Sequence, residues 1–371
     1  MSPRASAMSS DERKPVHMAD VASAAGVALS TVSRALSGNP GVSAQTRARI
    51  RRITEELGYV VSPEASKLSG GRTGRVGFVT PTIDEWFYAS VIAGATRVLA
   101  AHGIDVVLYP VADSAARARF FEDLPARRKV DAIIVIAFPL SGYEWERLDS
   151  MDVHAVVVGI VTPDRPSVGV VDESVGRQAV DHLLALGHRE IGMITCVDPE
   201  GFHYSSDVSR EQGFRAALAE AGVAVNEDFV VAVRWGIDGG SMGMSALLAL
   251  PHTPTAVFAF SDEVAFGALR TLRRAGLSVP EDMSLIGVDD HPMAESMDLT
   301  TVAQSPRRQG EIAAELCVGL LENADLPQQV SLSANLTIRR STTPPRPGRR
   351  ANAARYPNDQ VETEPIQTYS K

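Results

Sequence analysis

The sequence predicts a small all-α helix-turn-helix head followed by a larger α/β domain, whose two lobes are built on doubly wound parallel sheets. Three observations carry this prediction. Apolar residues recur at helical spacing in three short runs between Met18 and Tyr59. From Arg75 onward, short β-branched or apolar runs alternate with amphipathic helical patterns. The two ends of the chain are polar and carry too little apolar surface to fold, so we expect them to be disordered.

The three short helices of the head must share one small core, because none of them is long enough to be stable alone. Gly26 lies between the first two helices and supplies the left-handed residue that ends one helix and redirects the chain into the next. A helix, a tight turn and a second helix in this order form a helix-turn-helix.

The second helix, from about Leu29 to Ser37, places its apolar residues inward and leaves hydroxyls and one guanidinium facing outward. Ser and Thr hydroxyls bind phosphates or base edges, and Arg forms two hydrogen bonds to guanine. A polar helical face is commonly just solvated. Here the turn, the polar face and an arginine-rich third helix occur in the order that a DNA-binding motif requires. The predicted DNA contacts of the head are Leu29, Ser30, Thr31, Ser33, Arg34, Thr46 and Arg47.

Several short motifs of this head occur together: Asp20-Val21-Ala22, Ala25-Gly26-Val27, Thr31-Val32-Ser33-Arg34, Val42-Ser43, Thr46-Arg47 and Leu57-Gly58-Tyr59. In this combination the chain resembles the LacI/GalR family of bacterial transcription regulators, and the resemblance continues to about Ser341. His17 and Ala28 stand where that family usually has a capping Ser or Thr. Loss of such a cap costs about 1 kcal/mol, so we expect a slightly less stable head.

The segment after the head carries the start signals of a short helix. Ser62-Pro63-Glu64 combines a hydroxyl cap, a proline at the first position and an acid in the first turn. In the family the corresponding segment is a hinge helix, which pairs across a dimer at the operator centre and inserts a leucine into the minor groove. The resemblance therefore implies DNA contacts by Ala65, Lys67 and Leu68. A plain linker with Leu68 against the body is the alternative.

Composition and charge indicate the compartment of the protein and the part of the chain that binds nucleic acid. No apolar run approaches the length of a membrane span, and the N-terminal stretch lacks the apolar core of a signal peptide, which predicts a cytoplasmic, nucleoid-associated protein. Cys196 and Cys317 are far apart and are expected to be small buried hydrophobes. Residues 1–75 carry a net charge of +5, whereas the remainder carries −14. This asymmetry confines nucleic-acid contact to the head.

The alternation after Arg75 predicts two sets of strands and helices, because strands bounded by helices form a parallel sheet covered on both faces. We expect the chain to cross between the lobes near Ile160 and again near Asp289 to Gln304. Gly187, Gly222 and Gly276 are expected helix stops. The first set comprises Val76–Thr80, Phe87–His102, Ile104–Pro110, a helix ending near Arg128, Ala132–Phe138 and His154–Ile160. The second comprises Val168–Val171, Glu173–Leu186, Ile191–Cys196, Asp207–Ala221, Phe229–Val233, Gly240–Leu250, Ala256–Phe260, Asp262–Ala275 and Ser284–Val288.

Ligands of open α/β sheets bind at the carboxyl ends of the strands. The loop after the first predicted strand gathers aromatic residues around Asp84, and aromatic faces flanked by a carboxylate suit a sugar. Trp86 and Phe87 would serve equally well as core residues that cap the first helix. Trp235, after a later strand, is a weaker candidate for stacking on a sugar ring.

The family resemblance implies a two-lobed fold like that of periplasmic sugar-binding proteins, with an effector in the cleft. It places Arg210 and Asp289 at effector-contacting positions and Ser261 and Gln304 at further contact positions. An Arg–Asp clasp across the cleft is the alternative for the first pair. The predicted effector contacts are Asp84, Trp86, Phe87, Arg210, Trp235, Ser261, Asp289 and Gln304.

Two other classes of protein share parts of this pattern. Enzymes of doubly wound fold are common, but the chain contains no GxGxxG after a strand, no phosphate-binding loop, no nucleophile elbow and no metal-ligand cluster. A sugar-binding transport protein would need a signal peptide and no DNA-binding head. The sequence therefore predicts a non-enzymatic, cofactor-free regulator of transcription, most simply a repressor. Its expected partners are palindromic operator DNA, a second copy of the chain in a homodimer and a small sugar or sugar derivative, with no membrane contact.

The expected domain boundaries follow from these patterns. They are a disordered N-terminus at 1–15, a DNA-binding head at 16–60, a hinge helix or linker at 61–73, a two-lobed effector-binding and dimerisation domain at 74–343 and a disordered tail at 344–371.

Overall fold

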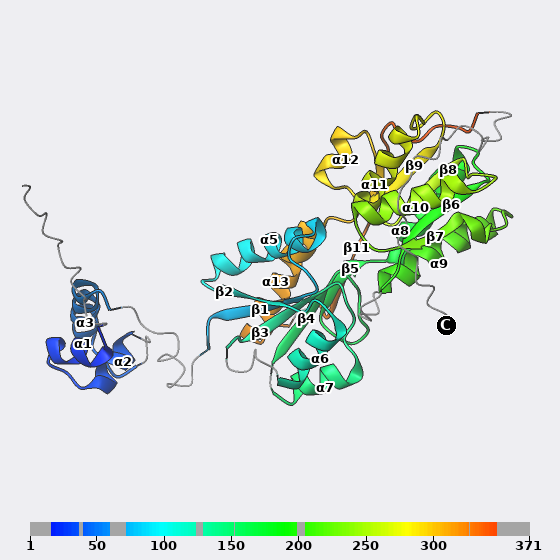
Figure 1. Cartoon of the computed structure of the whole chain (residues 1–371). Coiled ribbons are helices and arrows are strands. Elements are labelled where there is room, and N and C mark those ends of the chain that lie inside the picture. The colour runs from blue at the N-terminus through cyan, green and yellow to red at the C-terminus, as the bar shows by residue number, and fades with distance from the viewer. Residues whose placement is uncertain are drawn as a thin grey trace, which may run out of the picture. The chain divides into compact units, whose positions relative to one another are not determined.

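The structure is a computed structural model that describes residues 16–36, 40–59, 72–123, 129–151, 153–198, 205–325 and 327–346 (Figure 1). The chain divides into two compact units, Met1–Gly74 and Arg75–Lys371. The predicted disordered N-terminus, the hinge residues Ala65, Lys67 and Leu68, and the tail from residue 347 lie outside the described residues. No helix in the part of the chain that is described is both long and apolar enough to cross a membrane.

The first unit contains the three helices α1 (Met18–Ala25), α2 (Leu29–Leu36) and α3 (Ala44–Leu57). Their apolar faces form one core around Val21, Val32 and Ile50, each fully buried. Gly26 ends α1 in the left-handed conformation at φ 61°, as the sequence predicts. The carboxylate of Asp20 accepts a hydrogen bond from the backbone N–H of His17 at 2.7 Å. This is the bond that the acid makes in a capping box, so it does not require a Ser or Thr at position 17.

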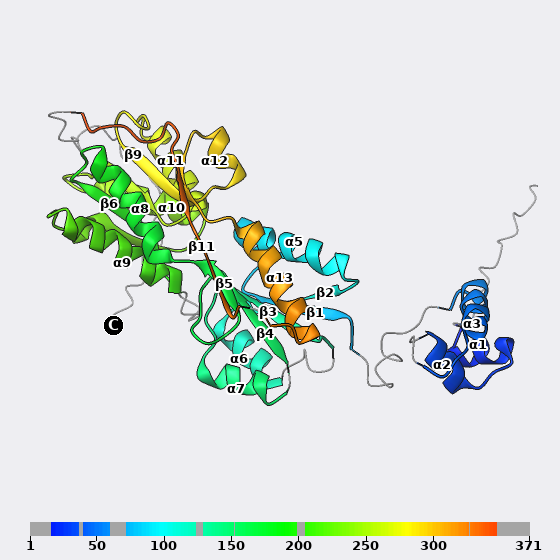
Figure 2. The same ribbon diagram turned by 180° about the vertical axis from the view of Figure 1, so that it is seen from behind.

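The second unit consists of two lobes, each built on a six-stranded sheet. The N-terminal lobe has the strand order β11-β5-β4-β3-β1-β2, and every pair in it is parallel. Helices α5 and α13 cover one face of this sheet, and α6 and α7 cover the other (Figures 1 and 2). Its elements are β1 (Arg75–Thr80), α5 (Trp86–Ala101), β2 (Asp105–Pro110), α6 (Ser114–Asp123), β3 (Ala132–Ile136), α7 (Gly142–Asp149), β4 (His154–Val158), β5 (Ser167–Val170), α13 (Pro306–Glu322) and β11 (Gln329–Leu332).

The C-terminal lobe repeats this architecture with the strand order β12-β10-β9-β8-β6-β7, in which only β12 runs antiparallel to its neighbour. Helices α10 and α11 cover one face, and α8 and α9 cover the other. Its elements are α8 (Asp172–Ala185), β6 (Ile191–Cys196), α9 (Ser205–Glu220), a 3₁₀ turn (Glu227–Phe229), β7 (Val230–Val233), α10 (Ile237–Ala249), β8 (Ala256–Ala259), α11 (Asp262–Arg274), β9 (Ser284–Asp289), α12 (Pro292–Ser296), β10 (Thr300–Ala303) and β12 (Asn335–Thr337).

The lobe crossings differ from the prediction in number and in place. The first crossing follows β5 at Val171 and not Ile160, because β5 pairs with β4 through Val157 with Ser167 and Val158 with Val168. The second follows β10 at Gln304, within the range expected. A third, after β11, was not predicted. Helices α7, α12 and α13 and strands β10 to β12 were also absent from the sequence interpretation.

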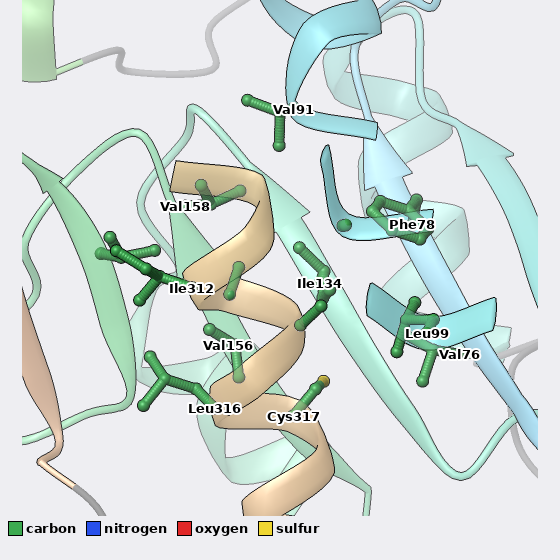
Figure 3. Close-up of a cluster of buried hydrophobic side chains, with 14 of the residues drawn as sticks. Val76, Phe78, Val91, Leu99, Ile134, Val156, Val158, Ile312, Leu316 and Cys317 are labelled. Carbon is green, nitrogen blue, oxygen red and sulfur yellow. The ribbon is translucent and has the colours of Figure 1, made fainter. Parts of the chain in front are cut away.

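Helices α5 and α13 cross at backbone contact. Together they bury a hydrophobic cluster against the sheet, part of which Figure 3 shows. Leu316 and Cys317 of α13 pack among residues of β1, β3 and β4. A Cβ atom at Gly94 would lie 2.1 Å from the carbonyl oxygen of Arg307, and one at Gly310 would lie 2.0 Å from that of Val91. The close crossing therefore depends on a glycine in each helix.

Local predictions of smaller features are confirmed. Gly187, Gly222 and Gly276 follow helices with φ angles of 97°, 66° and 70°. Cys196 and Cys317 are both buried and free. Burial raises the pKa of the Cys317 thiol to about 12, so this residue behaves as a small hydrophobe.

Candidate functional site

The outward face of α2 presents the side chains predicted for DNA. Leu29, Ser30 and Arg34 are exposed, and Thr31 and Ser33 are half-buried. Leu29 keeps 52% of its surface accessible, although it is a large apolar residue at the first position of the helix. The residues at the start of a recognition helix are the ones that contact base edges in this motif. The face therefore offers hydroxyl donors, one guanidinium and one apolar side chain.

The third helix supports this face. Ser43 caps α3 by accepting from the backbone N–H of Thr46 at 3.1 Å, and the two hydroxyls lie 2.8 Å apart. Arg49 donates from Nη2 to the carbonyl oxygen of Ala25 at 2.9 Å, which ties α3 to the end of α1. Thr46 and the neighbouring Arg47 are half-buried. Part of the arginine-rich helix thus stabilises the turn.

A cavity of about 350 Å³ opens between the lobes of the second unit, at the carboxyl ends of the strands. This volume is near the lower end of the range of about 300–1,000 Å³ typical of small-molecule sites. Six of the eight predicted effector residues line it: Phe87, Arg210, Trp235, Ser261, Asp289 and Gln304.

Arg210 is the fixed cation of the cavity. It is 5% exposed, and its Nε donates to Oδ1 of Asp172 at 2.9 Å, while Nη1 donates to the carbonyl oxygen of Phe260 at 2.8 Å. The guanidinium also lies 4.5 Å from the centre of the Phe260 ring. Close packing of α8 and α9 fixes this position, because a Cβ atom at Gly176 would lie 2.2 Å from the Arg210 carbonyl oxygen.

Asp289 forms the polar wall beside Arg210. It ends β9 at φ 123°, an unfavourable conformation for a residue with a Cβ atom, and Gln304 donates from Nε2 to its Oδ1. Burial raises its pKa to about 6, against the lowering effects of the Arg210 charge and the Gln304 hydrogen bond. Burial also raises the pKa of Asp172, and Arg210 opposes this rise. Asp289 and Arg210 belong to the same lobe, so the alternative of an Arg–Asp clasp across the cleft is wrong.

The other three predicted residues that line the cavity are also part of the structural framework of their lobes. Phe87 is 8% exposed, packs edge-on against Tyr88 at 5.7 Å and lies in the lobe core as well as at the cavity. Ser261 caps α11 by accepting from the backbone N–H of Val264 at 3.3 Å. Trp235 is half-buried against the core of its lobe.

Comparison with known proteins gives the family. Residues 17–62 match the family described as bacterial regulatory proteins, lacI family, and residues 180–342 match a periplasmic binding protein-like domain. The chain is 34% identical over 343 residues to the HTH-type transcriptional regulator AglR of Rhizobium meliloti (strain 1021), covering 89% of this chain and 95% of AglR. The chain belongs to the lacI family of bacterial regulatory proteins.

Solved structures agree with this assignment. The CelR–cellobiose complex shares 31% identity with a TM-score of 0.64, covering 88% of this chain and 99% of CelR. The Lac repressor dimer bound to operator and the anti-inducer ONPF shares 26% identity with a TM-score of 0.77, covering 89% of this chain and all of that one. The protein is therefore a DNA-binding transcriptional regulator and not an enzyme.

Two predicted residues of this lacI-family regulator lie outside the cavity lining. Asp84 is exposed, and its pKa is lowered by the hydrogen bond from the Thr82 hydroxyl. Trp86 instead contacts His291, with 4.9 Å between the ring centres. The boundary of α5 explains both placements, because the helix begins at Trp86 and Glu85, its N-cap residue, takes the position in the cavity.

The sequence interpretation missed several residues that line the cavity. Asp172, which holds Arg210, was also missed, because a partner on another helix leaves no local signal. The missed lining residues follow a strand or lie at the start of a helix, and this position was the signal that could have identified them. The missed lining residues with polar side chains are Thr82, Glu85, Tyr88, Asp198, Ser206 and Arg234.

Proposed function

We propose that this regulator is a repressor that binds a palindromic operator as a homodimer and whose operator affinity is set by a small sugar-like effector. The observation that carries the proposal is the cavity between the lobes, in which the buried group of Arg210, Asp289 and Gln304 faces aromatic side chains. A fixed guanidinium, a carboxylate and an amide supply donors and acceptors for hydroxyl groups. Aromatic rings supply a surface for the C–H face of a sugar ring.

The relatives support both partners. CelR was solved with cellobiose, and the Lac repressor was solved as a dimer on its operator. The cavity lining of this chain suits a neutral disaccharide, because the charge of Arg210 is already balanced by Asp172. A strongly anionic ligand would have to compete with that carboxylate and with Asp289.

The exposed side chains of the head support the proposal that it binds a specific DNA sequence. We assign operator contacts to α2 and to the start of α3, because these carry the exposed polar side chains beside a packed core. In a homodimer each copy places one α2 in one half-site, so the operator has the two-fold symmetry of the protein. The assigned residues are Leu29, Ser30, Thr31, Ser33, Arg34, Thr46 and Arg47.

The test combines thermal melting with operator binding by the full chain. We expect cellobiose, or another member of a panel of mono- and disaccharides, to raise the melting temperature of the second unit and to change the affinity for an operator selected from random DNA. At a ligand concentration of 100 times Kd the stabilisation is about 2.7 kcal/mol. Failure of the whole panel to do either contradicts the effector part of the proposal.

Two matched variants separate the two sites. Trp235→Ala lies in the cavity and should weaken sugar binding while leaving operator affinity without sugar unchanged. Arg34→Ala lies in the head and should do the reverse, with a loss of about 1–3 kcal/mol on the selected operator. Equal effects of each variant on both ligands contradict the assignment of the sites.

A further inference from the structure

The loop at the end of β9, residues 289–291, makes two contacts of different kinds. Asp289 lines the cavity and accepts a hydrogen bond from Gln304. The ring of His291 lies against Trp86 of the N-terminal lobe, with 4.9 Å between the ring centres and an angle of 55°. Neither of these two rings lines the cavity. The conformation of this loop therefore sets both a predicted effector contact and a contact between the lobes.

The backbone of the loop is bent in a way that a residue with a side chain disfavours. Asp289 has a φ angle of 123° and Asp290 one of 56°. Aspartate tolerates the second angle, which lies in the left-handed helical region, but the first angle favours glycine. Such a conformation persists only where the surrounding structure holds it. The side chains around the loop must therefore fix it.

Asp262 binds the last residue of the loop. It is the first residue of α11, directly after the cavity residue Ser261, and it is fully buried. Its Oδ2 accepts from the backbone N–H of His291 at 2.8 Å, and its Oδ1 accepts from the hydroxyl of Thr301 at 2.7 Å. Asp262 does not line the cavity itself, so any effect that it has on a ligand passes through the loop.

Thr301 extends this contact to the middle of the loop. Its hydroxyl donates to Asp262 and accepts from the backbone N–H of Asp290 at 3.3 Å. Thr301 is fully buried on β10, and its register partner on β9 is Gly287. A Cβ atom at Gly287 would lie 2.2 Å from Oδ1 of Asp262, so glycine leaves the space that the carboxylate occupies. Asp262 and Thr301, together called the loop clamp, thus bind two consecutive N–H groups of the loop.

The His291 ring is held as well as its backbone. Its Nδ1 accepts from the backbone N–H of Met293 at 3.0 Å, which caps α12. The ring also packs edge-on against Phe266 of α11, with 5.4 Å between the ring centres. With the N–H of His291 bound to Asp262, these contacts hold the ring at the position where it meets Trp86.

We propose that Asp262 and Thr301 are positioning residues for effector binding. They hold residues 289–291 so that Asp289 faces the cavity and His291 meets Trp86 of the other lobe. The effector role of the cavity rests on the proposed function. The loop conformation is a property of the free protein, so it can be tested both with sugar and without it.

Calorimetric titration of the full chain with cellobiose tests the effect on the cavity. Thr301→Val removes the hydroxyl and leaves the N–H of Asp290 and one oxygen of Asp262 without a partner, whereas Thr301→Ser keeps the hydroxyl. The valine variant should raise the Kd for cellobiose by about tenfold or more, because only molecules with the clamped loop bind well. The serine variant should bind like the natural protein.

Thr271→Val is the matched control. It removes a hydroxyl of α11 that donates to the carbonyl oxygen of Ser241 at 3.1 Å, away from the loop. A purely structural role of the Thr301 hydroxyl would lower the melting temperature of both valine variants and leave both Kd values unchanged. The positioning role raises the Kd of Thr301→Val alone.

Tryptophan fluorescence tests the contact between the lobes without sugar or DNA. The substitutions Trp145→Phe and Trp235→Phe leave Trp86 as the only tryptophan of the chain. In this form Thr301→Val should shift the emission of Trp86 to longer wavelength and increase its quenching by acrylamide, because the ring loses its contact with His291. The serine variant should cause neither change, and circular dichroism reports whether each form is folded.

The outcomes separate the loop clamp from the proposed function. If Thr301→Val matches Thr301→Ser in either the Kd or the Trp86 emission, the proposal is overturned, because the loop clamp acts on both ends of the loop. Equal Kd values for Thr271→Val and Thr301→Val overturn it too. Failure of every sugar to bind the natural protein contradicts the proposed function instead, and the Trp86 measurement then decides on the loop clamp alone.

Discussion

Replacement of Arg210 by alanine should destabilise the second unit and remove the response to effector. Operator binding by the head without effector should be unchanged. The substitution removes the ion pair with Asp172 at 2.9 Å, the hydrogen bond to the Phe260 carbonyl at 2.8 Å and the contact with the Phe260 ring at 4.5 Å. It leaves the Asp172 carboxyl group, which is 7% exposed, without its cation.

The expected cost is about 3–5 kcal/mol of the free energy of unfolding, the usual effect of removing one partner of a buried ion pair. Asp172 can reduce this cost by taking up a proton. Burial already raises its pKa, and loss of the lowering effect of Arg210 raises it further. When folding raises the pKa of a carboxyl group, the folded protein loses stability as the pH rises through that raised value. The deficit of the variant should therefore be smaller at pH 5 than at pH 8.

Urea unfolding followed by tryptophan fluorescence measures this cost, because all three tryptophans of the chain lie in the second unit. The double variant Arg210→Met with Asp172→Asn removes both charges and should recover a large part of the lost stability. Gel-shift titration without effector should give operator affinity close to that of the natural protein. A cost below about 1 kcal/mol with no dependence on pH would refute the electrostatic reasoning.

Three further substitutions test the packing and the recognition helix. Gly94→Ala should cost about 1–3 kcal/mol or more in urea unfolding, because its Cβ atom would lie 2.1 Å from the Arg307 carbonyl oxygen; Gly142→Ala, with nothing within 4 Å, is the control. Ser43→Ala removes the cap of α3 and should increase hydrogen exchange in that helix by the equivalent of about 1 kcal/mol. Leu29→Ala should reduce any preference of the protein for thymine over uracil in the selected operator, because the thymine methyl group is the apolar partner that the major groove offers to an exposed leucine; an undiminished preference would show that another residue contacts it.

The local pattern of the sequence was sufficient for most elements. Helical spacing and the position of Gly26 predicted the head, and alternation of strands and helices predicted both sheets. The lobe to which each strand belongs could not be predicted in the same way. The run at β5 has the composition of a buried strand in either lobe, and only its pairing with β4 decides that it belongs to the first. Helix α13 joins the N-terminal lobe after an excursion of more than a hundred residues, which no local pattern records.

The cavity illustrates the same limit at the scale of single residues. Six predicted residues line it, because the ends of strands and the starts of helices can be located from the sequence. The loop before α5 offered two neighbouring carboxylates, Asp84 and Glu85. The difference between them depends on the residue at which the helix begins. A shift of one residue turns a side chain from the cavity to solvent.

Gln304 shows how the cavity and the lobe crossing are joined. It lies between β10 of the C-terminal lobe and α13 of the N-terminal lobe. Its side chain donates to Asp289, while its backbone carbonyl accepts from Nε2 of Gln309 in α13 at 2.6 Å. A ligand that displaces or tightens the hydrogen bond to Asp289 therefore acts on a segment that is bonded directly to a helix of the other lobe. Because α13 packs against α5 at backbone contact, the same displacement reaches the helix whose first residue, Trp86, contacts His291 of the C-terminal lobe.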